Sequence, residues 1–239
     1  MGKFKVTVQP LGDDFLLVCW PTRISIEISE ELLAFEQLIV KQFGEFILGI
    51  NPAYASLCIR FKKEKISFEN FKKILLEAYQ IFGFKIVKTE KYWEIPVCYH
   101  PELGPDLLDC CEQTKLDLED FINLHTVPLY RIYFIGFLPG FLYLGGLNKK
   151  LFIPRKTTPR PKVPAGAVGI AGVQTGIYPQ ASPGGWQLIG QTKVSLFNPT
   201  QQPPTPFCAG DYLKFTAISK TVFARASHLP TLKIKEADE

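Results

Sequence analysis

The chain has 239 residues, of which 46% are hydrophobic and 21% charged, and its formal net charge is +4. This length allows one large domain or two modest ones, each with a buried core. The small positive charge argues against a nucleic-acid-binding protein, which usually carries a strongly basic face. The N-terminus runs straight into alternating apolar residues, without the long apolar stretch of a signal peptide or membrane anchor. We therefore expect a cytoplasmic protein without membrane contact.

The six cysteines and three histidines predict no metal site. No two cysteines have the Cys-x-x-Cys spacing, and no histidine stands at metal-ligand spacing from another histidine or from a cysteine. We expect free thiols in a reducing compartment.

The first part of the chain alternates between strand-like and helical patterns. Leu32, Phe35 and Ile39 recur at spacings of three and four, which predicts an amphipathic helix with Ser29 as its N-cap. The expected elements are strands at 4–8, 14–20, 46–50, 55–61 and 84–89 and helices at 30–43 and 67–82. This order predicts a small βαββαβ domain over residues 1–88, with helices on one face of a sheet.

The rest of the chain has a different texture. A strand is expected at 93–99 and helices near 105–113 and 118–125, the second of them capped by Asp117. Beyond these helices, Gly and Pro recur every few residues between apolar residues, which is typical of many short strands in a barrel or sandwich. We therefore predict an α+β protein whose β-barrel domain spans residues 89–239 and ends in a charged tail.

No familiar catalytic motif is present. The glycines of Gly166–Gly172 lack the Gly-x-Gly-x-x-Gly spacing, and no Lys-Ser or Lys-Thr follows them, so the segment is neither a dinucleotide fingerprint nor a phosphate-binding loop. Ser182–Trp186 is not a Gly-x-Ser-x-Gly nucleophile elbow. The residues alone therefore name no catalytic group.

Six cations lie between Lys149 and Lys162, and prolines interrupt the run. A solvated loop is the ordinary interpretation of such a run. Prolines limit backbone freedom, however, so the alternative is an anion site in which Arg155 and Arg160 offer planar forks to a carboxylate or phosphate. We take these two arginines as substrate-binding candidates.

The glycine-rich stretch 163–190 is the second candidate for a binding segment. Gln174, Thr175 and Tyr178 would line a polar cradle for an oxyanion or a lactam, with Ser182 and His125 as supporting residues. The alternative is a set of barrel turns with buried aromatic residues. That alternative accounts for Trp186, but it does not require the side chains of Gln174 and Thr175.

The same segments resemble a known family, the B subunits of bacterial 5-oxoprolinase, which are also described as allophanate hydrolase subunit 1. The similarity is dense over residues 93–215 and general before them. It is carried by Ile95-Pro-Val-x-Tyr99, Gly104-Pro-Asp-Leu107, Pro154-Arg-Lys-x-x-Pro-Arg160, Val163-Pro-Ala-Gly-x-Val-Gly-Ile-Ala-Gly172, Gln174-Thr-Gly-Ile-Tyr-Pro179 and Ser182-Pro-Gly-Gly-Trp-Gln-Leu-Ile-Gly190.

The resemblance implies a cyclophilin-like C-terminal barrel and a subunit that is inactive alone. It further implies a larger homologous partner subunit, a third subunit, and the ATP-dependent opening of 5-oxo-L-proline to L-glutamate, with ATP bound by the assembled complex. Three other functions stay open at this point. Relatives include the carboxyltransferase part of urea carboxylase and inhibitors of a sensor histidine kinase, and the barrel type alone suggests a peptidyl-prolyl isomerase, although fold does not carry function.

Overall fold

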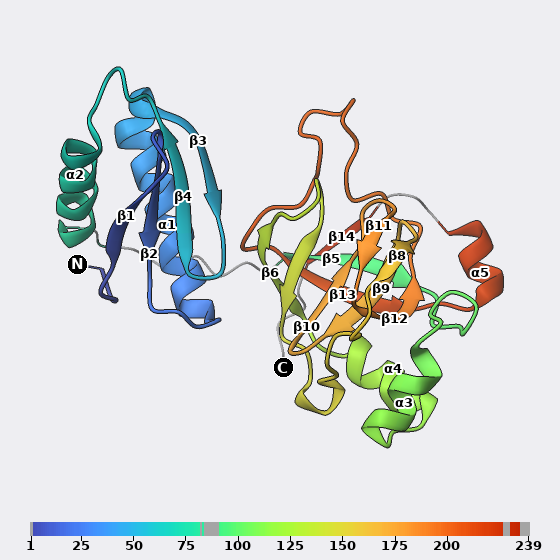
Figure 1. Cartoon of the computed structure of the whole chain (residues 1–239). Coiled ribbons are helices and arrows are strands. Elements are labelled where there is room, and N and C mark those ends of the chain that lie inside the picture. Colours follow the sequence, from blue (N-terminus) through green and yellow to red (C-terminus); the bar gives the residue numbers. More distant parts are fainter. Residues whose placement is uncertain (1, 82, 84–90, 227–229, 235–239) are drawn as a thin grey trace. The chain divides into compact units, whose positions relative to one another are not determined.

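The computed structural model describes residues 2–81, 83, 91–226 and 230–234. The chain divides into two compact units, Met1–Lys88 and Thr89–Glu239 (Figure 1). Both units contain helices and strands, which confirms the predicted α+β fold class. The predicted strand 84–89 and the border at 88/89 lie outside the described residues, so that border stays a prediction. None of the described helices is long and apolar enough to span a bilayer.

The N-terminal unit is one antiparallel sheet with two helices on one face (Figure 1). The strands follow the order β1-β2-β4-β3. The two strands predicted before the first helix form a β-hairpin, so the described elements run ββαββα. Their bounds are β1 Thr7–Leu11, β2 Phe15–Cys19, α1 Ile26–Phe43, η1 Gly44–Phe46, β3 Ile47–Pro52, β4 Ser56–Phe61 and α2 Phe68–Ile81.

Helix α1 begins one turn earlier than its apolar spacing predicts. Its N-cap is Ser25, and Ser29, the predicted cap, lies inside the helix, where its N–H donates to the Ser25 carbonyl at 3.0 Å. The exposed Ile26 interrupts the apolar pattern of the first turn, which hid the true start. Packing of the fully buried Ile28 into the core outweighs the modest helix propensity of isoleucine there.

A buried carboxylate ties the N-terminal segment to this unit. Glu31 on α1 is fully buried and accepts hydrogen bonds from the Lys3 N–H at 2.7 Å, the Trp20 indole N–H at 3.1 Å and the Tyr79 hydroxyl. A buried carboxylate is tolerated only where such donors replace water. These bonds therefore fix the segment before β1 to helix α1.

The C-terminal unit is built on an eight-stranded sheet in the order β12-β9-β10-β7-β6-β13-β5-β14. Beyond β5, Cys98 pairs with Gln191 at the end of β12, so the sheet closes on itself. Strands β8 and β11 form a separate two-stranded ribbon. The strand bounds are β5 Lys91–Val97, β6 Tyr130–Ile135, β7 Leu142–Gly145, β8 Arg160–Val163, β9 Ala167–Ala171, β10 Gln174–Ile177, β11 Ser182–Gly184, β12 Gln187–Gln191, β13 Tyr212–Ala217 and β14 Thr231–Ile234.

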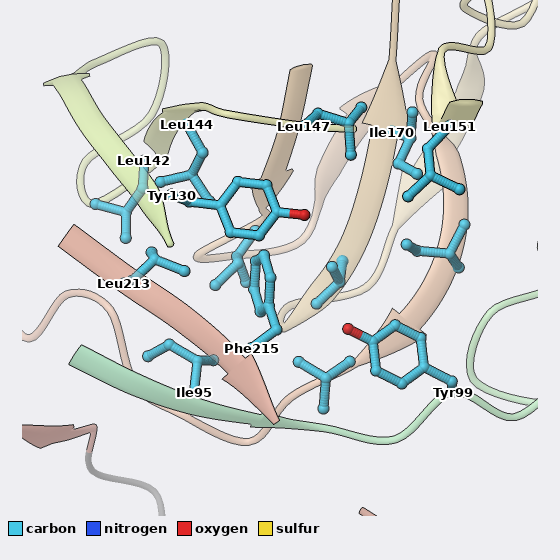
Figure 2. Packing of buried hydrophobic residues seen from close by; sticks show 14 of the residues in the cluster. Ile95, Tyr99, Tyr130, Leu142, Leu144, Leu147, Leu151, Ile170, Leu213 and Phe215 are labelled. Carbon is cyan, nitrogen blue, oxygen red and sulfur yellow. The ribbon is translucent and has the colours of Figure 1, made fainter. Parts of the chain in front are cut away.

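Two helices cover one end of this barrel (Figure 1). They are α3, Leu107–Thr114, and α4, Leu118–Thr126, and the predicted cap Asp117 accepts from the Asp120 N–H at 2.8 Å. The short η2, Lys149–Leu151, and α5, Lys220–Arg225, complete the unit. Inside the barrel the core is aliphatic and aromatic, with Tyr130, Leu144 and Phe215 at its centre (Figure 2).

Strand β9 is buried on both faces, which explains its small residues. Val168 and Ile170 point into the barrel core. Ala167 and Ala171 belong to a second apolar cluster on the outer face, with Gly169 between them. A Cβ at Gly169 would lie 3.2 Å from the Trp186 Cβ, so an aromatic layer leaves room only for small side chains.

Glu36 on α1 supplies a test of burial in the N-terminal unit. Burial raises the pKa of Glu36 to about 7 from its ordinary value of 4.5. A raised folded-state pKa means that stability is highest below the unfolded pKa and falls as the pH rises through 7. Glu36→Gln should therefore unfold at higher urea concentration than the wild type at about pH 8, and at the same concentration at about pH 4. The exposed Glu64→Gln should show no such pH-dependent gain, and equal behaviour of the two variants would contradict the prediction.

Candidate functional site

Strand β10 separates the predicted cradle residues onto two faces. Thr175 and Ile177 are fully buried and point into the barrel. Gln174 and Tyr178 take the opposite parity, and Tyr178 belongs to the outer apolar cluster. Gln174 is half-buried, and its side-chain Nε2 is buried without a hydrogen-bond partner among the described residues. The structure therefore brings Gln174 and Tyr178 to one face and leaves Thr175 on the other.

His125 and Thr175 form a closed network inside the barrel. The Thr175 hydroxyl donates to the Gly169 carbonyl at 3.0 Å, so it accepts from His125 Nε2 at 2.9 Å. His125 Nδ1 then accepts from the Tyr99 hydroxyl at 2.7 Å. Burial lowers the pKa of His125 to about 3, and its ring stacks on Phe215. This pair is a neutral part of the core without access to solvent, and it does not join the outer face.

An aromatic cluster covers the outer face of β9 and β10. Phe141, Tyr178 and Trp186 pack edge to face, with ring centroids 5.5 Å apart between Phe141 and each of the other two. Tyr143 lies beside Phe141 at 4.9 Å. A Cβ at Gly176 would lie 3.1 Å from the Trp186 ring, which explains a glycine at this point of β10. The prediction of buried aromatics at Trp186 is thus correct, because Phe141 and Tyr178 are each 2% exposed and Trp186 is 5% exposed.

Arg155 lies over the Trp186 ring of this buried cluster. Its guanidinium carbon is 5.8 Å from the Trp186 ring centre, and the residue is exposed. Burial raises the pKa of Tyr143 and of Tyr178, and the nearby positive charge of Arg155 acts against that rise in both. Arg155 has no ion pair among the described residues. Its charge is therefore available to an anion that arrives from solvent.

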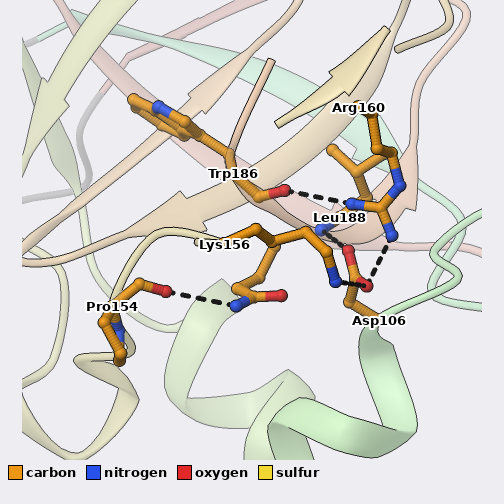
Figure 3. Close-up of polar contacts among 7 residues, drawn as sticks. Asp106, Pro154, Lys156, Arg160, Trp186 and Leu188 are labelled. Carbon is orange, nitrogen blue, oxygen red and sulfur yellow. Dashed lines mark hydrogen bonds and ion pairs between the residues drawn. The ribbon is translucent and has the colours of Figure 1, made fainter. Parts of the chain in front are cut away.

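Arg160, the second predicted arginine, is instead paired with a buried carboxylate (Figure 3). Its Nη2 lies 2.6 Å from Asp106 Oδ1, and Lys156 Nζ lies 3.1 Å from the same oxygen. Asp106 Oδ2 accepts from the Leu188 N–H at 2.7 Å. Burial would raise the pKa of Asp106, but the bonds from Arg160, Leu188 and Lys156 hold it below its ordinary value.

Asp106 is a residue of this site that the sequence did not single out. It is 2% exposed and stands directly before α3. The Gly104-Pro-Asp-Leu107 segment is one of the stretches that carry the family resemblance. A carboxylate in such a stretch is the feature of the sequence that could have pointed to Asp106. Its side-chain partners Lys156, Arg160 and Leu188 lie 50, 54 and 82 residues further along the chain, so no local pattern connects them.

Ser182, the remaining candidate, lies on the ribbon that carries Arg160. It begins β11 and pairs with Val163, while Gly184 pairs with Arg160. Its hydroxyl donates to the Pro183 carbonyl at 3.2 Å. The structure thus places Ser182 near the site's scaffold but shows its hydroxyl in a local contact.

Neither a metal centre nor a nucleotide loop is found in the described part of the chain. No group of three or more His, Cys, Asp or Glu side chains is arranged there to hold a metal ion. The glycine-rich segment 166–172 contains β9, whose backbone pairs with β10 on one side and with β12 on the other. A strand with both edges paired cannot wrap its N–H groups around a phosphate, so this segment does not fit ATP.

Fold and site together describe an α+β protein that carries an exposed arginine over a buried aromatic cluster outside a closed barrel. The chain belongs to the family of carboxyltransferase domain, subdomain C and D, whose family model matches residues 6–207. It is 39% identical over 224 residues to the B subunit of 5-oxoprolinase from Bacillus subtilis (strain 168), and the match covers 89% of this chain and 93% of that protein. These matches confirm the family resemblance.

Two solved structures are similar in fold. The crystal structure of TTHA0988 matches with a TM-score of 0.76 and 33% identity, over 89% of this chain and 41% of that one. This chain therefore spans about two fifths of TTHA0988. The urea carboxylase of Kluyveromyces lactis matches with a TM-score of 0.77 and 18% identity, over 96% of this chain and 24% of that one. At that identity the likeness shows a shared fold only.

The two arginines should differ in their effect on stability. Arg160→Ala leaves Asp106 buried with Lys156 and one N–H, so the free energy of unfolding should fall by about 2 kcal/mol, less than the full loss of a buried pair. Arg155→Ala removes an exposed charge and should cost less than about 1 kcal/mol. Scanning calorimetry of both variants, with the exposed Lys162→Ala as control, measures this difference. Equal losses for Arg155 and Arg160 would contradict the assignment.

The His125 network should make the barrel sensitive to acid. The ring stays neutral when folded and gains a proton when unfolded, so stability is full above about pH 6.5 and falls as the pH drops towards 3. One proton corresponds to about 1.4 kcal/mol per pH unit in that window. The free energy of unfolding, measured with urea between about pH 7 and pH 5, should depend less steeply on pH in His125→Gln than in the wild type. His100→Gln should show the wild-type dependence. An unchanged slope in His125→Gln would show that this ring is not the group that titrates.

Proposed function

We propose that this chain is the B subunit of an ATP-dependent 5-oxoprolinase, which opens 5-oxo-L-proline to L-glutamate with hydrolysis of ATP. The observation that carries the proposal is the 39% identity to the B subunit of the Bacillus subtilis enzyme along 93% of that protein. The chain acts in the cytoplasm with a larger homologous subunit and a third subunit, and it is inactive alone.

Within this proposal the outer face of the barrel binds the lactam. Arg155 pairs with the substrate carboxylate, since a guanidinium offers two parallel donors to a carboxylate. The Trp186 ring supports the Arg155 guanidinium from within, since Trp186 is only 5% exposed. Gln174 has the same strand parity as Tyr178, and its buried Nε2 has no partner among the described residues. In this proposal that Nε2 donates to the lactam carbonyl.

The chemistry requires more than this chain contributes. An unstrained lactam is a poor electrophile, so its opening needs an activated carbonyl oxygen. The glycine-rich segment of this chain is a buried strand that does not fit a nucleotide. We therefore place ATP binding and the activating step in the assembled complex, and we assign binding and orientation of the acidic lactam to this subunit.

The likeness to urea carboxylase does not favour that reaction for this chain. At 18% identity it supports a common fold, whereas the match to the 5-oxoprolinase relative spans nearly the whole length of both proteins. Binding to a histidine kinase and prolyl isomerisation have no observation in their favour.

Reconstitution with the two partner subunits tests the proposal. Glutamate release from 5-oxo-L-proline with ATP should appear only when all the subunits are present. In that complex Arg155→Ala should lower kcat/KM by about 30- to 1,000-fold, which corresponds to about 2–4 kcal/mol for one partner of a charged pair. Lys162→Ala, another exposed cation of the same stretch, serves as control. Turnover by the isolated chain would refute the division of labour, and a wild-type kcat/KM for Arg155→Ala would refute the binding site.

A further inference from the structure

The loop that carries Arg155 is fastened to the barrel on both sides of that residue. The Pro154 carbonyl accepts from the Gln187 side chain at 3.1 Å. The Lys156 N–H donates to the Gly185 carbonyl at 2.8 Å. The two anchors flank Arg155 in sequence, so the backbone at this residue has little freedom to move.

A buried carboxylate fixes the cations of the same loop (Figure 3). Asp106 Oδ1 holds Lys156 Nζ and Arg160 Nη2, and Arg160 Nη1 also reaches the Trp186 carbonyl at 3.5 Å. The side chain of Asp106 is 3% exposed, whereas those of Lys156 and Arg160 are 31% and 25% exposed. The two cations thus bend inward to one internal anion. Arg155 alone of these three cations points its charge elsewhere, over the Trp186 ring.

We propose that Asp106 is a positioning residue, whose carboxylate collects Lys156 and Arg160 and so sets the place where Arg155 meets the acidic group of the substrate. It acts through the loop and does not touch the substrate itself. The activity part of this inference rests on the proposed function, because it takes 5-oxo-L-proline as the acidic ligand.

Asp106→Asn is a sharp probe, because neither orientation of the new amide satisfies all partners. If the amide oxygen faces the two cations, the NH2 group faces the Leu188 N–H. If the oxygen faces Leu188, the NH2 group faces Lys156 and Arg160. The side chain keeps its size in both cases, so the change removes charge and acceptor capacity without a cavity. Asp109 lies in the first turn of α3, the helix that begins directly after Asp106. It is exposed and forms no ion pair with the described residues, so Asp109→Asn is a matched control.

In the reconstituted complex, Asp106→Asn should raise KM for 5-oxo-L-proline about tenfold and leave kcat within about twofold, as expected when a binding group is misplaced. Asp109→Asn should match the wild type. Combining Asp106→Asn with Arg155→Ala should add little to the loss from Arg155→Ala alone, because both act at one contact. Wild-type KM in Asp106→Asn, or losses that multiply in the double variant, would overturn the proposal. A fall in kcat and in melting temperature at unchanged KM would also overturn it, since that is a purely structural effect.

A second pair of measurements keeps the inference testable if that variant folds poorly or the complex has no 5-oxoprolinase activity. Lys156→Met removes one cation and leaves the Asp106–Arg160 pair, and it should raise KM by a smaller factor than Asp106→Asn. Amide hydrogen exchange of the full chain at residues 154–160 should speed up in Asp106→Asn and Lys156→Met but not in Asp109→Asn. An inactive wild-type complex with this exchange pattern would refute the proposed function and retain the positioning. Unchanged exchange would refute the positioning, whatever the activity.

Discussion

The buried carboxylate of Asp106 connects the parts of the barrel on which the candidate site depends. Its side chain binds two cations of the loop and one N–H of β12, and its backbone N–H donates to the Leu188 carbonyl at 2.9 Å. A carboxylate taken out of water costs several kcal/mol, and breaking such a pair leaves that cost uncompensated. The segment before it lies equally close to β12, because a Cβ at Gly104 would be 2.2 Å from the Ile189 carbonyl carbon. The start of α3, the strand β12 and the cationic loop therefore hold one another in place.

The two faces of the barrel wall differ because successive side chains of a strand point to opposite sides. The inner face is buried, and the polar chain there from Tyr99 through His125 to Thr175 satisfies its own hydrogen bonds. A neutral and fully buried histidine has no route to a substrate. The outer face carries small residues beneath Trp186, and above that ring lies a cation without an ion pair in the described part of the chain. The proposed ligand site therefore lies on the outside of the barrel.

Much of the fold could be predicted from the sequence because local patterns determine it. The apolar spacing of Leu32, Phe35 and Ile39 located α1, and the Gly- and Pro-rich texture indicated the barrel. The start of α1 was missed because the exposed Ile26 hides the helical period. The choice of site residues was weaker. Strand alternation alone separates Gln174 from Thr175, and applying it to β10 would have removed Thr175 from the cradle.

The difference between Arg155 and Arg160 could not be predicted in this way. Both stand beside prolines in one cationic run, and only the fold brings Asp106 to Arg160. Charge neutralisation by a distant residue is a tertiary property, which a sequence window does not contain. The same holds for Lys156, whose interaction with Asp106 turns a flexible surface cation into an anchor of the loop.

The central claim is that Arg155, and not Arg160, receives the acidic group of the ligand. The most direct measurement is the ¹⁵N NMR signal of each arginine Nε–H in the full chain within the reconstituted complex, assigned with Arg155→Lys and Arg160→Lys and followed during titration with 5-oxo-L-proline. We predict that the chemical shift of Arg155 changes with ligand concentration until it saturates. The chemical shift of Arg160 should not change, because Arg160 stays paired with Asp106. A shift of Arg160 with Arg155 unchanged, or saturation of the enzyme without a shift of Arg155, would contradict this claim.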